Sequence, residues 1–148
     1  MKDNYVKLTF AAIGENVATS RMVLSSLLAG YDLSLSALDE LKIALSEAVS
    51  NSIIHGYGED ASQMVTVEFT IADDILTLAV IDQGVGIADI KQAMEPTFST
   101  RPEHMGLGFV FMDSFMDSLE VVSTLGHGTT VLMKRSLKSE QLFKPTAV

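Results

Sequence analysis

Two polar side chains stand four residues apart in a stretch whose apolar residues recur at helical spacing. Glu47 and Asn51 would lie roughly 40° apart around a helix axis, so both project from one side. A carboxylate can accept the proton of an attacking hydroxyl, and a neutral amide oxygen suits a hard divalent cation. A solvated edge of an amphipathic helix is the alternative. A zinc site that includes His55 is a third interpretation, although no second His or Cys stands at ligand spacing.

A carboxylate also ends the most apolar stretch of the chain. Asp82 follows residues 75–81, and glycines follow it at 84 and 86. A carboxylate next to a buried strand needs hydrogen-bond partners. Glycines such as Gly84 and Gly86 allow the backbone to turn and to approach a flat ligand closely. No third glycine stands at the dinucleotide-binding spacing. An ordinary exit from a strand is the alternative, since Asp and Gly are common in turns.

Further glycines precede a second apolar helical pattern. Gly106 and Gly108 would open that helix, where backbone N–H groups can hold phosphate oxygens. The sequence has no Walker A motif, and a glycine-rich helix start without a ligand is the alternative. Arg101, in the preceding loop, could pair with phosphates or be solvated. Thr129 follows Gly128 before the last strand pattern, where a plain hairpin turn would also fit.

Apolar periodicity outlines the elements that must position these groups. Strands are expected at 5–10, 64–71, 75–81, 119–124 and 128–135, and helices at 16–29, from Ser36 to about Gly56, at 88–94 and at 106–117. Ser36 is the expected N-cap of the second helix, and Gly56 its left-handed C-cap. This order indicates the α+β class, as a two-layer α/β sandwich with a mixed, mostly antiparallel sheet and helices on one face.

Length and composition indicate one folded domain. The chain has 148 residues, which we divide into a domain at 1–136 and a loose C-terminal tail at 137–148. The net charge of -9 argues against a nucleic-acid backbone as the main partner. The absence of Cys excludes disulfides and thiolate metal sites. No apolar run approaches the ~18 residues of a membrane span, and we expect a cytoplasmic location.

The order and spacing of these motifs over residues 47–130 resemble the GHKL family of ATPases and kinases. This family includes gyrase, Hsp90 and the histidine kinases, and the resemblance implies the Bergerat type of ATP-binding fold. The stretches 50–57 and 98–100 are most similar to the bacterial anti-sigma factor serine kinases. Their details favour the sporulation branch, which acts on a sigma factor of the sigma F type. The stress-response branch, of the sigma B type, stays open as an alternative.

The resemblance implies one site for ATP and Mg²⁺ and assigns parts of it to the candidate residues. Glu47 would be the general base, Asn51 the Mg²⁺ ligand, and Asp82 the acceptor for the adenine amino group. The other expected nucleotide-binding residues are Gly84, Gly86, Arg101, Gly106, Gly108 and Thr129. Arg101 belongs to residues 96–105, which resemble the ATP lid of the family but are shorter than in the anti-sigma kinases.

The resemblance also implies an activity and partners. We expect a protein serine/threonine kinase that sequesters a sigma factor and phosphorylates a small anti-anti-sigma antagonist on Ser. A homodimer is expected, and the first strand could pair across it. A nucleotide-gated binding module without kinase activity is an alternative. The catalytic half of a sensor histidine kinase fits less well, because it needs a phospho-acceptor His on a preceding helical hairpin. His55, His104 and His127 all lie within the domain.

Overall fold

The computed structural model describes residues 3–95 and 107–138. Its elements, in chain order, are β1 (Asn4–Ala11), α1 (Glu15–Leu28), α2 (Leu35–Asn51), the π-helix η1 (Ser52–Gly56), β2 (Met64–Ala72), β3 (Ile75–Asp82), α3 (Ile90–Ala93), α4 (Gly108–Phe115), β4 (Ser118–Thr124) and β5 (Gly128–Ser136). The strands and α-helices lie where the sequence pattern placed them, with ends that differ by up to a few residues. Within the described ranges, no helix is both long and apolar enough to cross a membrane.

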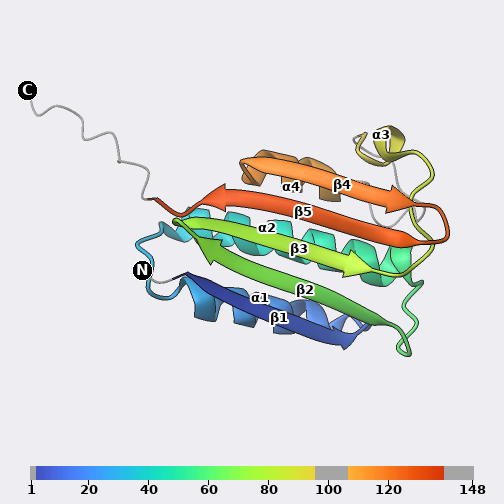
Figure 1. The fold of residues 1–148 in the computed structure, drawn as a ribbon, viewed down its shortest axis with the longest axis horizontal. Coiled ribbons are helices and arrows are strands. Elements are labelled where there is room, and N and C mark those ends of the chain that lie inside the picture. The colour runs from blue at the N-terminus through green and yellow to red at the C-terminus, as the bar shows by residue number, and fades with distance from the viewer. Residues whose placement is uncertain (1–2, 96–106, 139–148) are drawn as a thin grey trace, which may run out of the picture.

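The strands form one sheet in the order β1-β2-β3-β5-β4. Helices α1, α2 and α4 all lie behind this sheet in Figure 1, so they form one layer on one of its faces. The α+β two-layer fold is therefore confirmed. All four strand pairs are antiparallel, so the mixed sheet that we expected has no parallel pair among the described strands. In each of the hairpins β2–β3 and β4–β5, two strands that are consecutive in the chain are also antiparallel neighbours in the sheet.

Successive side chains along each strand point to opposite faces of the sheet, so every second side chain lies under the helices. Two rows of paired residues cross all five strands at this face and are wholly apolar. They are Leu8, Val67, Val80, Val131 and Val121 in one row, and Val6, Phe69, Leu78, Met133 and Leu119 in the other. Helix α2 buries Leu41, Leu45 and Val49 against them. Burial of this apolar face is the main stabilising term of the fold.

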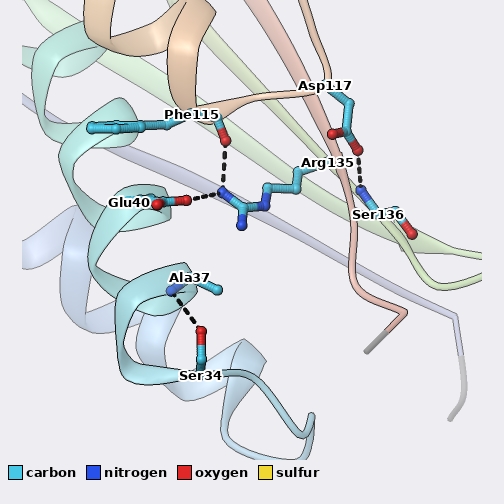
Figure 2. Close-up of polar contacts among 7 residues, drawn as sticks. All are labelled: Ser34, Ala37, Glu40, Phe115, Asp117, Arg135 and Ser136. Atoms are coloured by element: carbon cyan, nitrogen blue, oxygen red, sulfur yellow. Dashed lines mark hydrogen bonds and ion pairs between the residues drawn. The ribbon is translucent and has the colours of Figure 1, made fainter. Parts of the chain in front are cut away.

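The two ends of α2 differ from the sequence prediction. The N-cap is Ser34 and not Ser36, because the Ser34 backbone is extended and its hydroxyl accepts the Ala37 N–H at 3.0 Å (Figure 2). At the other end, Gly56 does not take a left-handed conformation. The helix instead widens into the π-turn η1, and the left-handed residues are Gly58 and Glu59, with φ values of 59° and 62°.

The C-terminal boundary also differs from the one we expected. Leu137 lies beyond residue 136 and is nonetheless buried in the core, with its N–H donated to the Asp74 carbonyl at 2.7 Å. Lys138 is exposed. The remainder of the expected tail, residues 139–148, lies outside the described residues.

A single guanidinium connects the sheet to two of the helices that cover it, α2 and α4. Nη1 of Arg135, on β5, donates to Glu40 Oε2 on α2 and to the Phe115 carbonyl at the end of α4, each at 2.7 Å (Figure 2). Arg135 shares the helix-facing side of β5 with Val131 and Met133. It therefore satisfies a terminal carbonyl of α4 and holds that helix beside the first half of α2.

Replacing Arg135 with Gln should lower the free energy of unfolding by about 2 kcal/mol, because two charge-assisted hydrogen bonds in a half-buried place are lost. Urea denaturation of the parent and the variant measures this change. The matched control is Lys134→Gln, since Lys134 is exposed and points away from the helices. The control should shift stability by no more than about 0.5 kcal/mol. Equal losses in the two variants would contradict the assigned role.

Candidate functional site

A pocket of about 550 Å³ opens between the end of α2, the turn η1, the loop after β3 and the start of α4. Six of the nine predicted site residues line it: Glu47, Asn51, Asp82, Gly86, Gly108 and Thr129. Gly84 is not among the lining residues, and Arg101 and Gly106 lie outside the described residues. The structure therefore brings residues from positions 47 to 129 of the chain around one cavity.

At one end of the pocket, the start of α4 packs directly against α2. A Cβ on Gly108 would lie 3.0 Å from Glu47 Oε2 and 3.3 Å from Asn51 Nδ2, so this close approach favours glycine. Gly108 is the first residue of α4, whose first N–H groups have no acceptor within the helix. Such N–H groups attract anions. A carboxylate, an amide and an anion-binding helix start therefore share this end.

At the other end, the Asp82 carboxylate is buried, with only 5% of the residue exposed. It accepts hydrogen bonds from the Gly84 N–H at 2.9 Å, from the Ser52 hydroxyl and from the Thr129 N–H. Burial raises the pKa of Asp82, and these three hydrogen bonds offset that rise only in part. The carboxylate is thus held in place by three segments and remains an acceptor at the wall of the pocket.

The loop after β3 is held to its neighbours by hydrogen bonds that its backbone N–H groups donate. Gln83 N–H donates to the Tyr57 hydroxyl at 2.6 Å, and Val85 N–H to the Gly56 carbonyl at 3.0 Å. A Cβ on Gly84 would collide with the Gly56 carbonyl. Close approach to another part of the backbone is therefore enough to require glycine at position 84, and the close approach to a flat ligand stays a prediction. Gly86 has a φ of 74° and approaches the Thr124 carbonyl.

Several residues at the pocket were not among the nine predicted site residues. Ser52 donates to Asp82, and His55 and Ile87 line the pocket. Gly56, predicted as a helix cap, instead leaves room for Asp82, because a Cβ there would lie 3.0 Å from the carboxylate. Only Ser52 could have been found from the sequence, because it is a polar residue that the helical pattern places near the apolar stripe.

The donor set is compatible with a magnesium ion shared with phosphates. Mg²⁺ keeps water and phosphate ligands and needs few from the protein, so the single amide oxygen of Asn51 is sufficient. No cluster of three or more His, Cys, Asp or Glu side chains suited to a metal occurs in residues 3–95 and 107–138. Glu47, Asn51 and His55 therefore do not belong to a cluster of this kind, which the zinc interpretation would need.

Comparison with known proteins agrees with this geometry. Residues 10–135 match the family model described as the histidine kinase-like ATPase domain. The chain belongs to this family. Members of it that resemble the chain along most of their length are named anti-sigma F factors. The protein from Lysinibacillus sphaericus is 47% identical over 131 residues, which is 87% of this chain and 90% of that protein. The one from Clostridium beijerinckii is 43% identical over 137 residues, or 91% and 96% of the two chains.

A solved structure has the same fold. A crystal structure of the RsbU and RsbW domains of a Mycobacterium tuberculosis protein superposes with a TM-score of 0.66 at 22% identity. The match covers 90% of this chain and 32% of that longer one. Family membership implies that the domain binds ATP.

The raised pKa of Asp82 predicts a pH dependence of stability. Between the ordinary value of 3.8 and the raised value, the folded protein binds more protons at Asp82 than the unfolded chain does. The free energy of unfolding contributed by Asp82 therefore falls as the pH rises through this interval. Asp82→Asn cannot ionise and should lack this fall. Urea denaturation at several pH values gives the difference between parent and variant, and a difference that stays constant above pH 3.8 would contradict the prediction.

The same substitution tests the pocket assignment. Asp82→Asn should weaken ATP binding by at least tenfold at neutral pH, because a charged acceptor is replaced by an amide that also carries donors. Titration calorimetry with ATP measures this loss. Unchanged affinity would remove Asp82 from the nucleotide site.

Proposed function

We propose that the chain is an ATP- and Mg²⁺-dependent protein serine kinase that also acts as an anti-sigma factor. The observation that carries this proposal is the placement of Glu47, Asn51 and the start of α4 at one end of a pocket whose other end holds Asp82. A nucleotide that spans the pocket would put its base at Asp82 and its phosphates at Gly108. The terminal phosphate would then lie within the reach of a carboxylate base.

The proposed transfer uses these groups in separate roles. The partner's Ser oxygen attacks the γ-phosphorus, the bond from that phosphorus to the ADP oxygen breaks, and the hydroxyl proton passes to Glu47. The N–H groups at the start of α4 bind phosphate oxygens, and the Asn51 amide oxygen binds Mg²⁺. When bound, the ion neutralises charge on the transferring phosphate. Gly108 keeps α4 close enough to α2 for both groups to face the same phosphates.

The proposed partners rest on the names of the similar proteins and on the exposed edge of the sheet at β1. Relatives with 40–47% identity are named anti-sigma F factors, which supports a sigma factor of the sporulation type as the bound partner. A small anti-anti-sigma antagonist is the proposed Ser substrate. Strand β1 is an edge of the sheet, and its exposed backbone supports pairing in a homodimer.

A phosphate-transfer assay tests the proposed kinase activity. The protein is incubated with labelled Mg-ATP and a panel of small antagonist proteins from the same cell. Replacing Glu47 with Ala should reduce transfer at least 100-fold, because the base is lost, while ATP affinity changes by less than about threefold. The matched control is Glu120→Ala, since Glu120 is exposed on the other face of the sheet.

The outcomes separate the alternatives. Label on the Ser of one antagonist, lost only with Glu47→Ala, identifies both the activity and the substrate. Transfer by that variant at the parent rate would overturn the role of Glu47. If no candidate is labelled although ATP binds, the chain is a nucleotide-gated binding module. Capture of a sigma B type factor in place of a sigma F type factor would assign the stress-response branch.

A further inference from the structure

One hydroxyl on β4 lies just behind the base end of the pocket. Ser123 Oγ is 2.7 Å from the Ile87 N–H nitrogen, 3.0 Å from the Gly128 carbonyl oxygen and 2.7 Å from Thr129 Oγ1. A hydroxyl has one proton and two lone pairs, so three hydrogen bonds exhaust its capacity. Ser123 is therefore fully committed within the protein, and its surroundings determine the direction of each bond.

Only one assignment satisfies all three contacts. The Ile87 N–H can only donate, so it takes one lone pair of Ser123. The Gly128 carbonyl can only accept, so it takes the single proton of Ser123. The remaining contact, with Thr129, must then use the second lone pair of Ser123. The Thr129 hydroxyl is therefore the donor in that contact, although distance alone allows either direction.

This direction determines what Thr129 offers to the pocket that it lines. With its proton directed at Ser123, Thr129 Oγ1 presents only lone pairs elsewhere. Thr129 pairs with Asp82 on one side and with Ser123 on the other, so the three residues form one row across β3, β5 and β4. Asp82 and Thr129 are then two neighbouring acceptors, a pattern that matches the two N–H donors of an exocyclic amino group.

We propose that Ser123 is a positioning residue for base selection: it holds the Thr129 hydroxyl as an acceptor and thereby makes the site select a purine with a 6-amino group. The proposal rests on the proposed use of this pocket for ATP and adds a residue that does not line it. Ser123 also holds the loop after β3 through Ile87, so its loss removes both constraints.

The test compares ATP with purine riboside triphosphate, which differs only in lacking the 6-amino group. The ratio of the two dissociation constants isolates recognition of that group, because changes in the phosphate or ribose contacts affect both ligands equally. The parent should prefer ATP by at least tenfold. In Ser123→Ala the Thr129 hydroxyl can rotate and donate to N1, which both ligands carry. The preference should therefore fall about fivefold.

Two further substitutions test whether Ser123 acts through Thr129. Thr129→Val, which removes only the hydroxyl, should lower the preference by a similar factor, and the double variant should show no additional loss. Ser123→Thr, which retains the hydroxyl, should restore the preference. Thr130→Val is the matched control, since its side chain faces away from the helices, and it should leave the ratio unchanged.

Three results would overturn the proposal. The first is equal weakening of both ligands by Ser123→Ala, which indicates a structural role alone. The second is additive loss in the double variant, which indicates independent roles. The third is a parent that binds both ligands equally. In all three the parent still binds ATP, whereas a parent that binds neither ligand would refute the proposed function itself. If Ser123→Ala does not fold, Thr129→Val against Thr129→Ser gives the same ratio test.

Discussion

The site depends on holding one buried carboxylate, Asp82, at the end of the apolar strand β3. On the helix-facing side of the sheet, two paired rows are apolar across all five strands, whereas the row at the mouth of the pocket contains Asp82, Thr129 and Ser123. Burial opposes ionisation of Asp82, and three hydrogen-bond donors from Ser52, Gly84 and Thr129 oppose that effect. Those donors come from the π-turn, the loop after β3 and β5, so the carboxylate can be held only when all three segments are folded together.

The opposite end of the pocket depends on the position of one short helix. Gly108 allows the start of α4 to contact Glu47 and Asn51, while Arg135 binds the carbonyl of Phe115 at its far end. The helix is thereby held along its length against α2, which itself carries the carboxylate and the amide. Because both helices belong to one packed layer, the carboxylate on α2 and the anion-binding start of α4 keep a fixed position relative to each other. The core packing and the geometry of the site are thus parts of one arrangement.

The fold and most of the site could be predicted from the sequence, because alternation and helical spacing are direct consequences of one-sided burial. The chemical types at Glu47, Asn51 and Asp82 were visible for the same reason, as polar residues at the borders of apolar patterns. Details that depend on tertiary contacts could not be predicted. Ser34 caps α2 because of its backbone angles, and the π-turn moves Gly56 beneath Asp82. Ser123 looked like an ordinary strand residue, because one of its partners lies in the distant loop after β3 and the other two lie on the neighbouring antiparallel strand β5.

The most direct measurement is a crystal structure of the protein with Mg²⁺ and a non-hydrolysable ATP analogue. We expect the adenine amino group within hydrogen-bond distance of the Asp82 carboxylate and of Thr129 Oγ1. We also expect phosphate oxygens at the N–H groups that open α4, with the terminal phosphate beside Glu47. A nucleotide bound in the reverse orientation, or outside the pocket between α2 and the loop after β3, would contradict the account.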